Sequence, residues 1–323
     1  MQALRPAWRR PASISLLRIG IHTSIATSLE NAALKAVELG ANTFQIFSAS
    51  PRMWRASMPR RDEILALQRA RERLDLLPLV IHVNYLINLA SLDPALRERS
   101  ITSFRGELER AEAIGAEHLV THPGSYRGQP IDQALAAFVL AMAEAADGGI
   151  APHVTVLLEN TAGYGAQIGS RLDELRTIRE LAARETHLKI GYCLDTCHLL
   201  AAGLDVASEA GLQKAVDEAD RILGIENVKV IHANDSKTPL GSHLDRHANI
   251  GEGHIGAAGF RRILAHPKLR EKPFILETPN ENDGDDRRNV ETLKSLSHAQ
   301  PKRAPIGRAK PGRRSGASKR SVS

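Results

Sequence analysis

The stretch Val230-Ile231-His232-Ala233-Asn234-Asp235 decides the fold, because it is an apolar run that ends in polar side chains able to bind a metal. Shortly after it, the chain carries Asp245-Arg246-His247. A histidine at the end of a short buried strand, followed by an Asp-x-His pair in a loop, indicates a metal site at the end of that strand. We therefore expect other strands to bring further ligands to the same place.

Seven further apolar runs have the length of buried strands, and amphipathic stretches with helical spacing separate them. All the runs together span residues 18–23, 43–48, 79–84, 118–123, 154–160, 189–195, 228–235 and 273–278. The clearest helical stretches span residues 29–40, 62–77, 94–115 and 131–146, and the expected helix C-caps are Gly40, Gly115 and Gly224. Eight β-α units with nearly continuous apolar strands predict an α/β fold, the (β/α)8 TIM barrel. Periodicity alone leaves a doubly wound open sheet as the alternative.

Potential metal ligands stand at the ends of six of these runs: His82, His122, Glu159, Asp195, His232 and Glu277. In a barrel the carboxyl ends of all strands meet at one face, where barrel enzymes keep their chemistry. A single buried histidine or acid at a strand end would ordinarily be a hydrogen-bonded core group. Six in succession favour bound cations, because unpaired carboxylates brought this close would repel one another.

Three residues outside the strand ends complete the candidate set: His198, Asp245 and His247. Five histidines and four carboxylates are too many for one zinc ion and suit two or three divalent ions. Cys193 and Cys197 flank Asp195 and could supply thiolates. Cys193 shares the strand parity of Asp195, however, so packing inside the barrel is the better interpretation.

The first two runs differ from the others. The first ends near His22, whereas the second ends in Phe47 and Ser48, which give His22 no acid or histidine to pair with. We therefore expect His22 to support the site or the core and not to bind an ion directly.

Length and composition limit the class of protein. With 323 residues and 42% apolar content, the chain can bury a large core. No apolar run reaches the length of a bilayer span, and two cysteines are too few for a disulfide framework. We expect a soluble, monomeric, cytoplasmic protein without membrane contact.

The formal net charge of +6 comes from the two ends of the chain. Residues 298–323 hold eight Lys or Arg and residues 1–18 hold four Arg, with no acid in either segment. Without these charges, residues 19–297 carry a formal net charge of −6. We expect a disordered extension over residues 1–17, a barrel domain over residues 18–297 and a disordered basic tail over residues 298–323.

Two loops expected beside the metal site carry side chains that are unusual for solvent-exposed segments. One loop, residues 50–54, contains Arg52, and the other, residues 84–88, contains Tyr85 and Leu86. Such side chains either fold back as caps on the barrel or act as wedges that unstack a nucleic acid. Beside a metal site we favour the wedges.

Six spaced motifs follow one another along the chain: His82-Val83-Asn84-Tyr85-Leu86-Ile87-Asn88-Leu89, His122-Pro123-Gly124-Ser125, Leu158-Glu159-Asn160-Thr161-Ala162-Gly163, Leu194-Asp195-Thr196-Cys197-His198, Asp245-Arg246-His247 and Gly251-Glu252-Gly253. In residues and order they resemble the signatures of the endonuclease IV family, over residues 18–297. The resemblance implies a zinc-dependent apurinic/apyrimidinic endonuclease of DNA base-excision repair on a xylose-isomerase-like (β/α)8 barrel.

The resemblance also implies how the candidate ligands are shared among three zinc ions, with Mn²⁺ as the alternative at one or more positions. Glu159 would bridge two ions. The ligands of the first ion would be His82, His122 and Glu159, those of the second Glu159, Asp195, His232 and Glu277, and those of the third His198, Asp245 and His247.

The implied reaction is hydrolysis of the phosphodiester on the 5′ side of an abasic nucleotide in double-stranded DNA, leaving a 3′-hydroxyl and a 5′-deoxyribose phosphate. Water activated between the bridged ions would attack the phosphorus, and the third ion would stabilise the departing 3′ oxygen. Glu159, Asp195 and Glu277 would be the catalytic residues of this step. DNA with 3′-blocked ends is the second implied substrate, through a 3′-phosphodiesterase and 3′-phosphatase activity.

The resemblance gives Arg52, Tyr85 and Leu86 the role of inserting into the DNA. The neighbours of Arg52, Ala49-Ser50-Pro51, depart from the polar residues expected there. Selectivity for the lesion would follow from a lower free-energy cost of flipping, because an abasic nucleotide has no base to unstack.

The basic tail is either a solvated extension or an electrostatic arm for the DNA backbone. If it is an arm, deleting residues 298–323 is expected to reduce the slope of DNA affinity against salt concentration, because binding then releases fewer counterions. Titrations of an abasic duplex between about 50 and 200 mM salt measure this slope. An identical slope in the truncated chain would leave the solvated extension as the interpretation.

Two other functions fit parts of the sequence. A sugar isomerase or epimerase could use a histidine and carboxylate site on the same barrel, but it needs only one or two metals and has no use for the Asp245-Arg246-His247 loop or the Tyr85-Leu86 pair. A DNA-binding protein that has lost catalysis would not need the complete ligand set. Activity on an abasic oligonucleotide separates both from a nuclease.

Overall fold

The computed structural model describes residues 17–298. The predicted basic tail beyond His298 and the predicted N-terminal extension before Leu17 lie outside the described residues. Within the described part, no helix is both long enough and apolar enough to cross a membrane.

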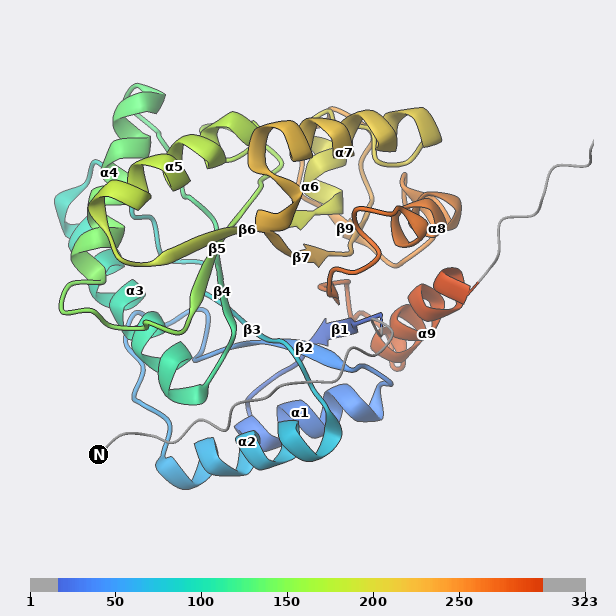
Figure 1. The fold of residues 1–323 in the computed structure, drawn as a ribbon, viewed down its shortest axis with the longest axis horizontal. Coiled ribbons are helices and arrows are strands. Elements are labelled where there is room, and N and C mark those ends of the chain that lie inside the picture. The colour runs from blue at the N-terminus through green and yellow to red at the C-terminus, as the bar shows by residue number, and fades with distance from the viewer. Residues whose placement is uncertain (1–16, 299–323) are drawn as a thin grey trace, which may run out of the picture.

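A closed barrel of eight strands, paired in parallel throughout, forms the centre of the fold (Figure 1). The strand order is β1-β10-β7-β6-β5-β4-β3-β2. Closure confirms the predicted (β/α)8 barrel and excludes the open sheet. The strands are β1 (Ile19–His22), β2 (Thr43–Phe47), β3 (Leu79–His82), β4 (His118–Thr121), β5 (Thr155–Glu159), β6 (Lys189–Asp195), β7 (Val228–His232) and β10 (Phe274–Leu276).

Helices surround the barrel and cover the outer face of its sheet (Figure 1). They are α1 (Leu29–Glu38), α2 (Arg61–Leu74), α3 (Pro94–Ile114), α4 (Ile131–Ala145), α5 (Leu172–Glu185), α6 (Thr196–Ala201), α7 (Glu209–Leu223), α8 (Gly256–Ala265), α9 (Asp285–His298) and the 3₁₀ turn η1 (Ile225–Asn227). Helix α3 shows why they begin and end where they do. Asp93 accepts hydrogen bonds from the backbone N–H groups of Ala95 and Leu96, and Gly115 ends the helix at a φ of 80°.

Side chains on the barrel strands alternate between two separate apolar clusters. The larger cluster joins residues such as Ile81 and Leu119 to apolar side chains of the surrounding helices. The smaller cluster fills the barrel interior and consists of Val80, Val120, Leu157, Cys193, Val230 and Ile275. Because strand side chains repeat every second residue, the side chain two positions after each interior residue also points toward the barrel axis, one layer nearer the carboxyl ends.

The structure departs from the sequence expectations at the strand ends. His122 and Glu277 lie one residue beyond the ends of β4 and β10 and not within the strands. The loop after β7 contains a small antiparallel sheet, β8 (Asp235–Ser236) and β9 (His247–Ala248), which the sequence pattern did not predict. The short helix α6, directly after β6, was also not predicted.

Candidate metal centre

The predicted ligands at the strand ends converge because each follows a residue of the interior cluster by two positions. The pairs are Val80 and His82, Val120 and His122, Leu157 and Glu159, Cys193 and Asp195, Val230 and His232, and Ile275 and Glu277. All six therefore point toward the barrel axis at its carboxyl end. Glu159, Asp195 and His232 have no exposed surface, so this part of the site is enclosed by protein.

Glu159 stands between two groups of donors. One of its oxygens, Oε2, lies 3.2 Å from His82 Nε2 and 3.0 Å from His122 Nε2. The other, Oε1, lies 2.8 Å from His232 Nδ1, which is in turn 3.2 Å from Glu277 Oε2. With Asp195, the second group offers donor atoms that all lie within 4.8 Å of one another. One carboxylate is thus shared by two candidate ion sites.

A third group brings helix α6 and the loop after β7 together. His198 on α6 points Nε2 at Asp245 Oδ2 over 3.1 Å, and His247 Nε2 lies 3.2 Å from Asp245 Oδ1. His247 Nε2 is also 3.7 Å from Asp195 Oδ2. The third group therefore adjoins the group around Glu159, and all nine residues form one continuous centre.

Three of the histidines are fixed by hydrogen bonds to backbone carbonyl oxygens. His82 Nδ1–H donates to the Val83 carbonyl oxygen over 2.7 Å. His198 Nδ1–H donates to the Asn160 carbonyl oxygen over 2.9 Å, and His247 Nδ1–H donates to the Glu277 carbonyl oxygen over 2.9 Å. A carbonyl can only accept, so the proton of each neutral ring is on Nδ1. Each ring thus directs the lone pair of Nε2 into the centre, as a metal ligand must.

Two asparagines that the sequence analysis did not single out position the carboxylates. Asn234 donates to Asp195 Oδ2 over 2.6 Å and accepts from the Glu277 backbone N–H over 2.8 Å. Asn160 accepts from the Asp195 backbone N–H over 2.7 Å. Each asparagine lies one or two residues after a predicted ligand at a strand end, and this adjacency was the available signal.

Asp235 anchors the loop that carries the third group. Its buried carboxylate accepts hydrogen bonds from five backbone N–H groups, those of Ser236, Gly251, Gly253, Ile255 and Gly256. A Cβ on residue 253 would lie 2.4 Å from the Ser236 carbonyl oxygen, so only glycine fits there. The Gly251-Glu252-Gly253 motif therefore has a structural role, holding the β8–β9 loop against the barrel.

The carboxylates and histidines of the centre stabilise each other's charged forms. Burial opposes ionisation of Glu159, yet the His232 and His122 rings keep the pKa of this carboxyl well below its usual range. Burial likewise disfavours the charged forms of His198 and His247, but Asp195 and Asp245 raise the pKa of His198 to about 10 and that of His247 to about 9. Protons on these rings thus balance the carboxylates, and a divalent cation would replace them.

The geometry of the third group fits a cation better than it fits hydrogen bonds. The Nε2 atoms of His198 and His247 are buried and make no aligned hydrogen bond, although a carboxylate oxygen of Asp245 lies near each. Buried polar atoms rarely lack a partner. An ion bound by both nitrogens and by Asp245 would satisfy them, and imidazole with carboxylate is a usual donor set for zinc.

Cys193 and Cys197 lie near the centre, but thiolate ligation is disfavoured. Cys193 belongs to the interior apolar cluster, as its strand parity predicts. Burial raises the pKa of both thiols to about 12, so both carry their protons at neutral pH.

The three predicted DNA-inserting residues lie on loops after β2 and β3. Tyr85 is 67% exposed, and its ring centroid lies 5.9 Å from that of the predicted ligand His82 and 5.3 Å from that of Phe47. Leu86 is half-buried beside it, and Arg52 is exposed on the other loop. Tyr85 therefore presents an aromatic surface beside the centre, whereas no contact joins Arg52 to the centre among the described residues.

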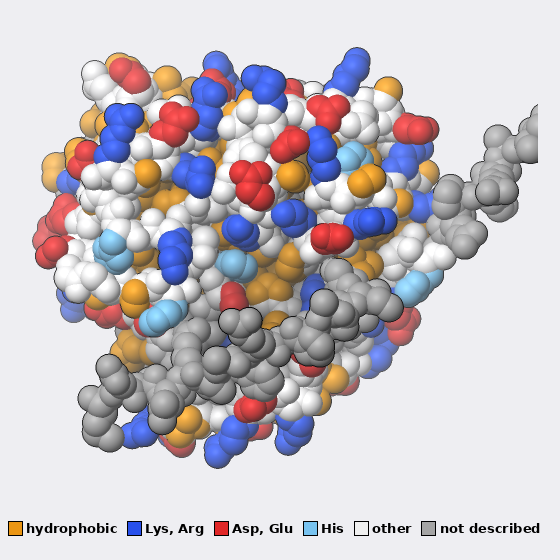
Figure 2. Space-filling model, viewed as in Figure 1, with side chains coloured by type: hydrophobic (Ala, Val, Ile, Leu, Met, Phe, Trp, Pro, Cys, Tyr) orange, Lys and Arg blue, Asp and Glu red, His pale blue; other side chains and the backbone are white. Residues whose placement is uncertain are grey.

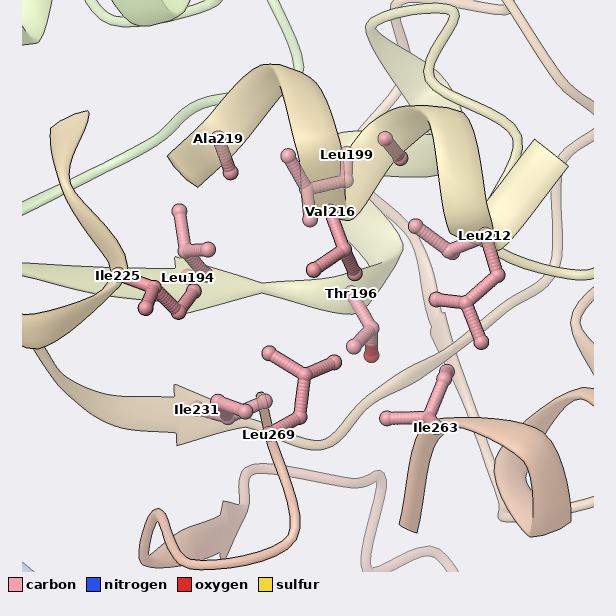
Figure 3. Close-up of a pocket in the computed structure, with 12 residues that line it drawn as sticks. Leu194, Thr196, Leu199, Leu212, Val216, Ala219, Ile225, Ile231, Ile263 and Leu269 are labelled. Carbon is pink, nitrogen blue, oxygen red and sulfur yellow. The ribbon is translucent and has the colours of Figure 1, made fainter. Parts of the chain in front are cut away.

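The enclosed apolar cavity in Figure 3 is not part of this centre. It lies between β6, β7 and helices α6, α7 and α8, has a volume of about 30 Å³, and is lined by Thr196 and apolar side chains. On the face seen in Figure 2, Lys and Arg side chains are interspersed with Asp and Glu. The cavity is lined by no titratable side chain, so it is not a competing catalytic site.

The chain resembles known proteins over most of its length. Residues 33–299 match a protein family described as a xylose isomerase-like TIM barrel. A relative from Solibacter usitatus named "Probable endonuclease 4" is 62% identical over 282 residues, which cover 87% of this chain and 97% of the relative.

Two solved structures show the same fold. Endonuclease IV from Thermus thermophilus is 38% identical, with a TM-score of 0.75 over 86% of this chain and 98% of that chain. A D-tagatose 3-epimerase-like protein is 20% identical, with a TM-score of 0.63 over 87% of this chain and 97% of that chain. At that identity, the second likeness concerns the fold alone.

Proposed function

The chain belongs to the endonuclease IV family of metal-dependent, DNA-cleaving hydrolases of DNA repair, and on this premise we propose the bond that it cuts and the ions that it uses. It is an apurinic/apyrimidinic endonuclease that hydrolyses the phosphodiester 5′ to an abasic site in double-stranded DNA, leaving a 3′-hydroxyl and a 5′-deoxyribose phosphate. It binds three divalent ions, which we propose to be zinc. Its second activity is the removal of 3′-blocking groups. It works as a monomer in the cytoplasm.

The observation that carries this proposal is the sharing of ligands among three adjoining groups. Glu159 faces His82 and His122 with one oxygen and His232 with the other, and Asp195 lies between the second and third groups. A site for one or two ions, as a sugar epimerase needs, would leave His198, Asp245 and His247 without a purpose. Hydrolysis of a phosphodiester benefits from one cation beside the attacking oxygen and another beside the leaving oxygen.

Each residue of the centre has a task in this reaction. Ions held by these residues would supply an activated water and neutralise charge on the phosphate. Glu159 faces both inner groups, and the third group, which adjoins Asp195, would stabilise the leaving oxygen. Three divalent ions also exceed the charge of the four carboxylates, so the centre attracts a phosphodiester although residues 19–297 are acidic overall.

The loops beside the centre would select the lesion. Tyr85 stacks edge-on against Phe47 and lies beside His82, so its exposed ring would meet a DNA strand that enters the centre. Tyr85, Leu86 and Arg52 would fill the space that the flipped nucleotide leaves in the duplex.

A nicking assay tests the proposed function. The purified protein is expected to cut a duplex with one abasic site on its 5′ side, to stop when a chelator removes the metal, and to resume when zinc is added back. The same preparation is expected to leave a panel of keto-sugars unchanged. Epimerisation of a sugar without nicking would contradict the proposal, and binding without metal-dependent cutting would indicate a DNA-binding protein that has lost catalysis.

A further inference from the structure

Two polar side chains in register with each other, Gln45 on β2 and His22 on β1, interrupt the apolar layer beneath the proposed ligands. Gln45 on β2 pairs in register with Val80, a member of the interior cluster, and it is fully buried. On six of the other strands this layer holds Val80, Val120, Leu157, Cys193, Val230 and Ile275. Burying an amide among apolar side chains is unfavourable unless hydrogen bonds compensate, so the contacts of Gln45 decide its role.

The amide of Gln45 connects two proposed ligands of the second ion. Its Nε2 donates to Glu277 Oε1 over 2.5 Å, with His22 Nδ1 3.1 Å away, and its Oε1 lies 2.9 Å from His232 Nε2. An ionised carboxylate only accepts, so the NH₂ group must face Glu277 and the carbonyl oxygen must face His232. His232 Nε2 therefore carries a proton, and in a neutral ring Nδ1 is left with its lone pair.

In this arrangement the neutral ring of His232 is the Nε2–H tautomer, the opposite of the three histidines that bond to backbone carbonyl oxygens. His82, His198 and His247 donate from Nδ1 to backbone carbonyls and present Nε2. His232 presents Nδ1, which lies 2.8 Å from Glu159 Oε1 and 3.2 Å from Glu277 Oε2. Its Nε2 partner is the side chain of Gln45, which a substitution can remove.

We propose that Gln45 is a positioning residue for the second ion: it fixes the tautomer of His232 and the orientation of Glu277. The inference rests on the proposed function, since it requires that Glu159, Asp195, His232 and Glu277 bind a metal. Gln45 would act through its contacts with His232 and Glu277 and not on the ion or the DNA directly. The first two strands, which carry no predicted ligand, thus support the centre through Gln45 and through His22, for which a supporting role was expected.

Replacing the amide by a thioether tests this role, because Gln45→Met keeps the length of the side chain and removes both hydrogen bonds. Partners that orient a ligand typically contribute 10- to 100-fold to metal affinity, so zinc affinity at one of the three sites is expected to fall by about that factor. Competition with a chelator measures the three affinities. Val80→Ala, in the same layer but without a polar contact to a ligand, is the matched control and is expected to lower them less than Gln45→Met does.

A second measurement does not depend on how the variant folds. Nitrogen-15 NMR of the imidazole rings in the zinc-loaded natural chain is expected to show His232 protonated at Nε2 and bound through Nδ1. A proton on Nδ1, or three unchanged affinities in folded Gln45→Met, would overturn the inference while leaving the proposed function intact. A natural chain that binds fewer than three ions would instead contradict the proposed function.

Discussion

Glu159→Gln is expected to lower kcat/KM for a 5′ cut at an abasic site by at least about 10³-fold, the largest effect of any single substitution in this chain. The amide has nearly the same shape as the carboxylate, but it cannot bridge two cations. In the amide, an NH₂ group also replaces one of the two carboxylate oxygens. This group faces either the pair His82 and His122 or the single ring of His232. Loss of a catalytic cation removes several kcal/mol of transition-state stabilisation, which corresponds to a factor of this size.

Metal content separates this explanation from misfolding. A folded Glu159→Gln variant is expected to retain the ion bound by His198, Asp245 and His247 and to lose or weaken the other two. The control is Glu180→Gln, an exposed glutamate on α5 paired only with Arg176, for which activity and metal content should be unchanged. Cleavage at the natural rate with a full set of ions would show that Glu159 does not bridge.

His247→Ala is expected to lower kcat by about 10²- to 10³-fold and to change the KM for abasic DNA little. The substitution removes one ligand of the third group, so the charge that stabilises the leaving oxygen is weakened or lost, and removal of one such contribution has an effect of this order. Binding should persist because the loops with Tyr85 and Arg52 are untouched. Single-turnover kinetics and equilibrium binding of the same duplex separate the two quantities.

The matched control for this substitution is His254→Ala. His254 belongs to the same stretch of chain but its side chain is outside the centre, and only its backbone N–H bonds to Ser236. Unchanged turnover in His247→Ala would contradict the assignment of a third ion. Equal loss in both variants would indicate that the loop as a whole, and not the imidazole of His247, matters.

Much of the centre could be predicted from the sequence because parallel strands end at one face of a barrel. A predicted ligand at each of six strand ends needs only the period of two to point inward, as Val80 with His82 and Val230 with His232 show. The fold followed from the same pattern. The partition of the ligands into groups was a consequence of the family resemblance, and the structure adds the distances.

The residues that support the ligands could not be predicted in the same way. Gln45 was overlooked because its run seemed to end in Phe47 and Ser48, whereas the interior position is two residues earlier. Asp235 follows a ligand strand but turns to bind the backbone of residues 251–256, a contact that depends on how a distant loop folds. Strands of two residues, such as β8 and β9, carry no periodicity at all.

The number of metal ions per chain tests the central proposal most directly. Elemental analysis of the zinc-saturated natural chain, after removal of free metal, is expected to give three equivalents of zinc, one for each group of ligands. His247→Ala should give two under the same conditions, and the His254→Ala control should give three. A natural chain that saturates at one or two equivalents would contradict the three-ion centre.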